Sequence, residues 1–213
     1  MTLKIGRMVI GAVQTNCYFV YDEEQQRAEK DAIVFDAADQ GATIYERLKA
    51  KGFRVAGILL THAHFDHIWG VQELRARSGA KVYAYEGERP LCESADLNVS
   101  ADVGRACTVK PNQYVKDGEE ITIAGMTCKV IATPGHTIGS CCYYFEEAGI
   151  LLSGDTLFEE SVGRSDLPTG STGELVRSVK EKLFVLPDET KVYPGHGDAT
   201  TIGHEKQYNP FCA

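Results

Sequence analysis

Short apolar runs recur along most of the chain, and polar or turn-forming residues separate them. Runs of this kind, alternating or continuous, are typical of β-strands. The pattern predicts strands over residues 3–10, 16–21, 32–35, 55–60, 81–85, 121–123, 126–132, 140–145, 150–152 and 191–193. Some of them follow one another after short turns, so we expect hairpins and exclude a purely parallel sheet.

Helical spacing of apolar residues replaces this pattern in other segments. It predicts helices over residues 43–51, 71–77, 86–93 and 174–186. In the first of these, Ile44 and Leu48 are four residues apart on one face, and Gly52 ends the helix. Residues 94–113 show weak periodicity, which predicts a long loop able to border a site.

The length and charge of the chain indicate its number of domains and exclude some classes of partner. The chain of 213 residues shows no repeat and no linker, so we expect a single domain over residues 1–213. Its formal net charge of -8 argues against nucleic acid or an anionic membrane as a partner. No run approaches the ~20 apolar residues of a membrane-spanning helix.

Cysteine usage indicates the compartment. The seven cysteines are odd in number and mostly scattered, so they do not form a disulfide framework. This usage is typical of a reducing environment. The first seven residues also lack the apolar core of a secretory signal. We therefore expect a cytoplasmic protein.

The strongest candidate chemistry follows the apolar run at residues 55–60, where His62, His64, Asp66 and His67 occupy six positions. On a strand, His67 would point away from the other three side chains. On a helix, His62 would pair with Asp66 and His64 with His67, and the two pairs would face different directions. A loop that winds into a helix could aim them at two adjacent points. The spacing therefore favours two metal ions with separate ligands.

Three further residues repeat one pattern, in which an apolar strand ends and a turn carries a His or an Asp. They are His136, Asp155 and His196. Donors at strand ends share one edge of a sheet and are held by rigid elements, as a preorganised metal site requires. Imidazole and carboxylate donors suit zinc and also admit iron or manganese.

With these motifs in place, the chain resembles the metallo-β-lactamase superfamily and, within it, the short glyoxalase II-like hydrolases. The matching segments are residues 61–70 (THAHFDHIWG), 133–139 (TPGHTIG), 153–158 (SGDTLF), 163–166 (GRSD) and 193–197 (YPGHG). The resemblance implies an α/β fold, a four-layer αββα sandwich of two mixed sheets flanked by helices. It also implies a metal site at the edge of the sheets.

The resemblance further implies two divalent transition-metal ions. One would be bound by His62, His64 and His136, and the other by Asp66, His67 and His196. Asp155 would bridge them. A hydroxide shared by the two ions would attack a thioester or a related activated acyl substrate, with Asp66 and Asp155 as catalytic residues.

The substrate contacts rest on fewer residues. Arg164 corresponds to a basic residue that contacts an anionic substrate in glyoxalase II-like enzymes, and a surface salt bridge is the alternative for this residue. Tyr143 and Tyr144 alternate on a strand, so one should lie in the core and the other in the cleft, and we take Tyr143 as the substrate contact. Asp39 and Asp198 are candidates for orienting ligand histidines, and the sequence does not place them. We expect His204 to lie in solvent.

Other functions remain open from the sequence. Seventeen residues follow His196, so we expect the C-terminal helical extension that binds glutathione in glyoxalase II to be missing. A small-molecule acyl thioester is the expected partner, and lactone hydrolysis is an alternative. A mononuclear iron enzyme resembling persulfide dioxygenases, with His62, His136 and Asp155 as ligands, is another. The missing export signal disfavours β-lactam hydrolysis.

Overall fold

Two β-sheets form the centre of the computed structural model, which describes residues 1–212. Across the first sheet, the strands are β1 (Leu3–Ile10), β2 (Thr15–Asp22), β3 (Lys30–Phe35), β4 (Phe53–Leu60), β5 (Lys81–Tyr85) and β6 (Gln113–Val115). The first three pair antiparallel, whereas β3 to β6 pair parallel. The carboxyl ends of β3 and β4 therefore lie side by side, and the segments that follow them meet at one edge.

The second sheet is also mixed. Across it, the strands are β14 (Thr200–Thr201), β13 (Lys191–Pro194), β10 (Ile150–Gly154), β9 (Cys141–Phe145), β8 (Met126–Ala132) and β7 (Glu120–Ile123). Only β10 and β13 pair parallel among these described strands. Because β9 runs opposite to both of its neighbours, β8, β10 and β13 all point the same way. Their carboxyl ends share one edge.

A short ribbon and several helices complete the fold. The ribbon pairs β11 (Leu157–Phe158) with β12 (Ser161–Val162). The α-helices are α1 (Gly41–Ala50), α2 (Phe65–Ile68), α3 (Val71–Ser78), α4 (Arg89–Glu93), α5 (Thr172–Ser178) and α6 (Ile202–Tyr208). Shorter turns of helix are η1 (Glu86–Glu88), η2 (Glu146–Ala148) and η3 (Val179–Leu183).

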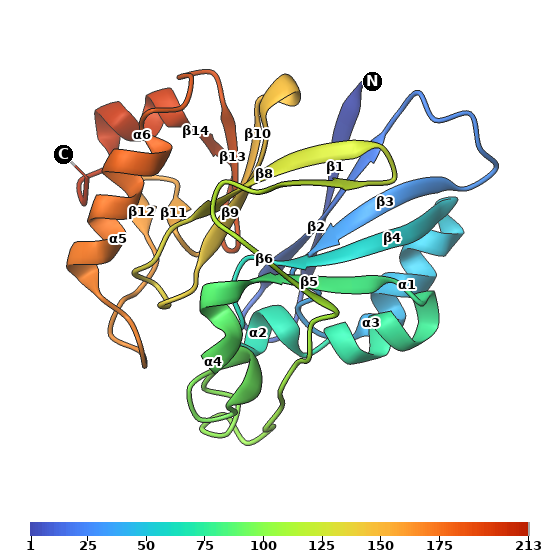
Figure 1. The fold of residues 1–213 in the computed structure, drawn as a ribbon, viewed down its shortest axis with the longest axis horizontal. Helices are drawn as coiled ribbons and strands as arrows, with labels where there is room; N and C mark the ends of the chain where they lie inside the picture. Colours follow the sequence, from blue (N-terminus) through green and yellow to red (C-terminus); the bar gives the residue numbers. More distant parts are fainter. Residues whose placement is uncertain (213) are drawn as a thin grey trace.

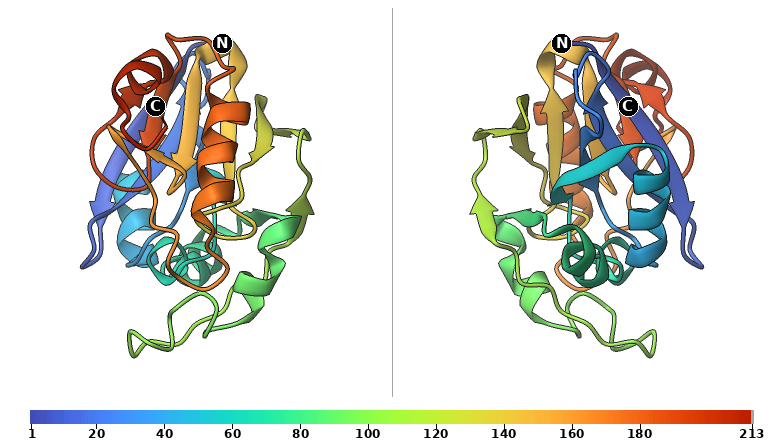
Figure 2. Two further views of the ribbon diagram at one scale, coloured as in Figure 1. Left: turned by 90° about the vertical axis from the view of Figure 1, so that its left-hand side faces the viewer. Right: turned by 90° about the vertical axis from the view of Figure 1, so that its right-hand side faces the viewer.

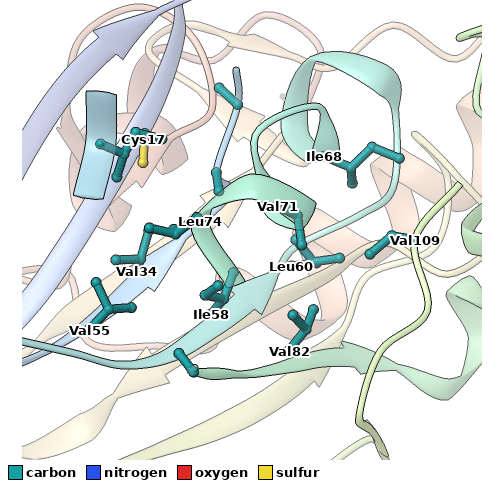
Figure 3. Packing of buried hydrophobic residues seen from close by; sticks show 14 of the residues in the cluster. Cys17, Val34, Val55, Ile58, Leu60, Ile68, Val71, Leu74, Val82 and Val109 are labelled. Atoms are coloured by element: carbon teal, nitrogen blue, oxygen red, sulfur yellow. The ribbon is translucent and has the colours of Figure 1, made fainter. Parts of the chain in front are cut away.

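Four layers result from the packing of these elements. Helices α1 and α3 cover the outer face of the first sheet, and α5, η3 and α6 cover that of the second (Figure 1). The two side views in Figure 2 show the helices outside the sheets at either end of this arrangement. On the first outer face, Val71 and Leu74 of α3 pack against Val34, Ile58 and Leu60 (Figure 3). The predicted αββα sandwich of two mixed sheets is confirmed.

A cluster of buried side chains fills the space between the two sheets. Its first-sheet members include Tyr18, Val20, Ile33, Phe35 and Leu59, and its second-sheet members include Val130, Tyr143, Phe145 and Leu152. Each sheet therefore buries side chains on both of its faces. Within residues 1–212, no helix has the length and apolar character that crossing a membrane requires.

Most predicted elements occur near their expected positions. The long loop expected over residues 94–113 is confirmed up to Asn112, because no helix or strand occurs between α4 and β6, which begins at Gln113. The last predicted long helix begins two residues early, at Thr172, where Ser171 caps it by accepting from the N–H of Glu174. It continues as the π-helical turn η3 and ends at Leu183, three residues before the predicted end.

Candidate metal centre

The histidine-rich segment leaves the edge of the first sheet as a loop and then becomes a helix. His62 and His64 lie on the loop after β4, whereas Asp66 and His67 lie on the single turn of α2. The N–H of His67 donates to the carbonyl of His64 at 2.9 Å, which closes this turn. The change from loop to helix lets four side chains within six positions converge, as the spacing predicted.

One group of three donors consists of buried imidazoles. Nε2 of His136 lies 2.9 Å from Nδ1 of His64 and 3.2 Å from Nε2 of His62. All three side chains are almost fully buried. His136 reaches them from the turn after β8, so this group joins the edges of both sheets. One ion placed among the three nitrogens would contact all of them.

A second group combines imidazoles with a carboxylate. Oδ2 of Asp66 lies 3.2 Å from Nε2 of His196 and 3.5 Å from Nε2 of His67. His196 comes from the turn after β13 and is the most exposed of these side chains, at 28%. This group is therefore the one that solvent and small molecules reach.

Asp155 connects the two groups. Its Oδ2 lies 3.6 Å from Nε2 of both His136 and His196, and its Oδ1 lies 3.4 Å from Nε2 of His67. It follows β10, whose carboxyl end lies between those of the strands that deliver the two histidines. One carboxylate thus faces donors of both groups.

The donor set fits divalent transition-metal ions. Imidazole nitrogens and carboxylate oxygens form three sets, His62/His64/His136, His62/His67/Asp155 and Asp66/His67/His196, and the atoms within each set lie within 4.8 Å of one another. Nε2 of His67 and Oδ1 of Asp155 are buried and have no hydrogen-bond partner. Buried polar atoms normally have partners, and a metal ion would supply one here.

Charges within the cluster divide the histidines into two kinds. Burial and the neighbouring histidines lower the pKa of His62 and lower that of His64 to about 3, so these rings are neutral near pH 7. Burial also opposes the charged form of His67, but the carboxylates of Asp66, Asp155 and Asp36 outweigh it and raise its pKa. The sequence showed which rings were present, and the folded environment decides which of them carry protons.

Asp36 orients one of these rings. Its Oδ2 lies 3.0 Å from Nδ1 of His67, and its carboxylate also accepts from the N–H and Oγ1 of Thr61 at 2.8 and 2.7 Å. The expectation that Asp39 or Asp198 does this was wrong, because Asp39 pairs with Arg105 and Asp198 with Arg7. Asp36 directly follows β3, so the pattern of a polar residue at a strand end could have identified it.

Glu88 is a buried carboxylate that the sequence analysis missed. Its Oε1 accepts from the N–H of Ala63 at 2.7 Å, and its Oε2 accepts from Oγ1 of Thr137 at 2.8 Å. These partners lie beside His62, His64 and His136 in the chain, so Glu88 ties together the loops that carry the first group. Burial raises its pKa to about 7, against the effect of these hydrogen bonds. It stands among charged neighbours in the sequence, which look like a solvated surface.

Other contacts hold the remaining donors in place. Nδ1 of His136 lies 2.6 Å from the carbonyl of Arg164, so this nitrogen donates and Nε2 is left for a metal. Asn16 donates from its side chain to the carbonyls of Pro194 and Gly197, both at 2.9 Å, and so fixes the turn that carries His196. A Cβ atom at Gly195 would overlap Oδ1 of Asp155, so only glycine allows this close approach.

The two residues predicted to contact the substrate lie in different environments. Tyr143 does not reach the cleft, and that expectation was wrong: its side chain is 0% exposed between the sheets, and its hydroxyl donates to the carbonyl of Leu60 at 2.9 Å. Tyr144 is also buried, on the opposite face of the same strand.

The side chain of Arg164 is 61% exposed and pairs with Asp166 through two hydrogen bonds of 2.8 Å. His204 lies outside the cluster and contacts Glu160, as expected of a surface residue.

Residues 10–196, which contain the whole donor set, match the sequence profile of the family described as Metallo-beta-lactamase superfamily. The chain belongs to this superfamily. Among metallo-β-lactamase superfamily proteins, the probable metallo-hydrolase YqgX of Bacillus subtilis is 37% identical over 98% of this chain and 97% of its own length. The hydroxyacylglutathione hydrolase GloC of Haemophilus influenzae is 29% identical over 98% of both chains.

Solved structures from the superfamily agree with the fold. BLEG-1, described as a B3 metallo-beta-lactamase, superposes with a TM-score of 0.91 and 36% identity over 98% of this chain and 99% of its own. TTHA1623 in a di-iron-bound form gives 0.85 and 34%, over 97% and 99%. ETHE1 from Myxococcus xanthus gives 0.78 and 28%, over 97% and 83%. Proteins with different descriptions thus share this architecture.

Proposed function

We propose that this protein is a dinuclear metal-dependent hydrolase of thioesters or related activated acyl compounds, similar to glyoxalase II. One observation carries the proposal. Asp155 faces His67, His136 and His196 at 3.4, 3.6 and 3.6 Å, and so touches donors of both groups. A single ion has no use for seven donors, because zinc sites are almost always tetrahedral. Two adjacent ions that share one carboxylate account for all seven.

The proposed ligands follow from the two groups. His62, His64 and His136 would hold one ion, Asp66, His67 and His196 would hold the second, and Asp155 would be shared by both. Zinc is the proposed metal, and the donors also suit iron or manganese. Two such ions lower the pKa of a shared water and polarise the acyl carbonyl.

The chain's own residues orient this chemistry. Oδ2 of Asp66 accepts from Oγ1 of Thr15 at 2.8 Å, which fixes the plane of its carboxylate beside the exposed His196. Asp66 and Asp155 together limit where a nucleophilic water can lie, and so direct it toward the substrate. A departing thiolate needs no strong acid, because a free thiol has a pKa of about 8.5. This favours thioesters among acyl substrates.

The proposed partner is a small-molecule thioester in a reducing, cytoplasmic setting. The GloC relative supports a thioester, since it is described as a hydroxyacylglutathione hydrolase. All seven cysteines are free thiols in the structure, which fits the proposed setting. Arg164 is the proposed contact for an anionic group of the substrate.

A second candidate is a mononuclear iron oxidoreductase resembling persulfide dioxygenases. His62, His136 and Asp155 would be its ligands, and Nε2 of His136 lies 3.2 and 3.6 Å from donor atoms of the other two. The similarity to ETHE1 and to a di-iron-bound structure supports iron as the alternative metal. Lactone and β-lactam hydrolysis belong in the same comparison, because BLEG-1 is described as a lactamase.

Metal analysis followed by a substrate panel separates these functions. The dinuclear hydrolase should bind close to two equivalents of metal and hydrolyse acyl thioesters faster than lactones or β-lactams. His196→Ala should lower the metal content toward one equivalent, and His204→Ala, at the surface, should leave it unchanged. Metal content near one equivalent, with oxygen consumption on glutathione persulfide and no hydrolysis, would establish the oxidoreductase instead.

A further inference from the structure

A mostly apolar cavity of about 260 Å³ adjoins the second group of donors. Its walls include Ile10, Val13, Phe65, Trp69 and Val103, and Asp66 belongs to the same lining. These residues come from three separate segments: the end of β1 with the turn after it, α2 with the residue that follows it, and the long loop before β6. The cavity therefore begins at a proposed metal ligand and extends away from it between apolar side chains.

The walls of the cavity are held together by contacts between these segments. Nε1 of Trp69 donates to the carbonyl of Arg105 at 3.0 Å, and the N–H of Phe65 donates to the carbonyl of Asn98 at 3.1 Å. The guanidinium of Arg105 lies 4.8 Å from the ring centroid of Trp69 and pairs with Asp39 at 2.8 Å. The cavity is thus preformed and does not need a ligand to assemble it.

Two valines at the cavity leave about half of their surface in solvent. Val13 is 48% exposed and Val103 is 46% exposed, and they lie in different segments. Apolar side chains that gather around one hollow are typical of a ligand-binding groove. Among the described residues that line the cavity, the charged ones are Asp39 and Asp66 and none is basic. The lining therefore offers nothing to a negatively charged group.

We propose that this cavity receives the acyl chain of the substrate, and that the preferred chain is apolar, uncharged and short. This inference rests on the proposed thioester hydrolysis and names its substrate class. A water molecule takes up about 30 Å³ of liquid, so the volume has room for roughly four to eight carbon atoms. A peptide-like thiol carrier with several charges is too large, and burying an unpaired carboxylate there costs several kcal/mol. The thiol portion therefore lies outside the cavity.

Trp69 is the only tryptophan in the chain, so its fluorescence reports directly on the cavity. The protein would be loaded with zinc, which has no redox chemistry, and titrated with acetate, butanoate, hexanoate and octanoate. Each added methylene should tighten binding about fourfold until the volume is filled, and should shift the Trp69 emission. The kcat/KM for the matching acyl thioesters of one thiol should rise in the same order.

Variants of the exposed valines test the position of the chain. Val103→Asp and Val13→Asp should each reduce the preference for hexanoyl over acetyl thioesters by about tenfold or more, the effect of losing two methylene contacts. If the aspartate variants do not fold, Val103→Ser replaces them in the same measurement and should also reduce the preference for hexanoyl over acetyl thioesters. Val185→Asp is the matched control, since Val185 is 71% exposed after η3 and outside the cavity lining.

The two proposals fail in different ways. Equal affinity for all chain lengths, or the same loss of preference in Val185→Asp, overturns the cavity as the acyl site even if thioesters are hydrolysed. Chain-length-dependent Trp69 emission without hydrolysis of any thioester supports the cavity as a site for an apolar chain and overturns the proposed reaction.

Discussion

Oδ2 of Asp36 lies 3.0 Å from Nδ1 of His67, and Nε2 of the same ring faces the carboxylates of Asp66 and Asp155 in the metal centre. The carboxylate of Asp36 accepts from the N–H and hydroxyl of Thr61, so it is itself held at two points. The contact joins the ends of two parallel strands, β3 and β4, at the edge of the first sheet. A histidine oriented in this way presents Nε2 to a metal without a search among rotamers.

Replacing Asp36 should therefore weaken metal binding without removing a ligand. In Asp36→Asn, the amide would place a donor near Oγ1 of Thr61 or Nδ1 of His67, and we expect metal affinity to fall about 10–100-fold. Competition with a chelator measures this loss. Asp198→Asn is the matched control, because Asp198 is exposed and pairs with Arg7 at the surface. Equal affinity in the two variants would contradict an orienting role.

Asp155→Ala should affect both ions at once. Its carboxylate faces His67, His136 and His196, and no other described acid faces histidines of both groups. We expect metal content to fall at both sites and kcat/KM to drop at least ~100-fold, the equivalent of about 3 kcal/mol of lost charge stabilisation. Elemental analysis and thioester assays measure the two effects. Unchanged metal content would show that Asp155 is no bridge.

Proton release should differ between the two groups of donors. Burial and neighbouring histidines keep the pKa of His62 and His64 low, so metal binding there displaces few protons. The pKa values of His67 and His196 are raised by nearby carboxylates despite burial, so a metal must displace protons from these rings. Titration calorimetry in buffers of different ionisation enthalpy should show net release near pH 7. Absence of release would contradict these charge states.

The sign of the pH effect on folding follows from the same rings. A histidine with a raised folded pKa stabilises the fold fully below its unfolded value of about 6.5, and this contribution is lost as pH rises through the folded pKa. The metal-free protein should therefore lose stability above about pH 6.5 as His67 and His196 deprotonate. The metal-loaded protein should not, because the ions replace those protons. Urea unfolding of both forms between pH 6.5 and 9 tests the difference.

Tyr143→Phe should change stability and leave substrate binding as it is. The variant loses the hydrogen bond from the hydroxyl to the carbonyl of Leu60, which is buried between the sheets. The expected cost is about 1 kcal/mol in the free energy of unfolding. KM for a thioester should not change. A raised KM at unchanged stability would restore Tyr143 as a substrate contact.

Arg164→Ala should raise KM more than it lowers kcat for an anionic thioester. The guanidinium of Arg164 is exposed, and it is the backbone carbonyl of this residue that contacts His136. The substitution therefore keeps the metal centre intact. A contact that binds the ground state and the transition state equally well raises KM when it is lost and leaves kcat unchanged. Arg177→Ala is the control, since Arg177 is a similarly exposed arginine paired with Glu174. Matching kinetics in the two variants would exclude Arg164 from the substrate site.

Tyr143 shows why strand alternation did not locate the cleft. Period-two alternation correctly places Tyr143 and Tyr144 on opposite faces of β9. One face packs against the first sheet and the other against the helical layer, so both tyrosines are buried. Alternation distinguishes core from solvent only where one face of a sheet is open. Here neither face is.

The sequence by itself determined the donor chemistry, because three imidazoles and a carboxylate sit within six positions and three more donors follow strand ends. Local spacing and strand direction were enough to predict that they converge. Only the tertiary structure decided which acids support them. Asp36 reaches His67 through parallel pairing of distant strands, and Glu88 joins two loops across the sheets. A single carboxylate has no periodicity, so its sequence neighbours do not reveal whether it is buried.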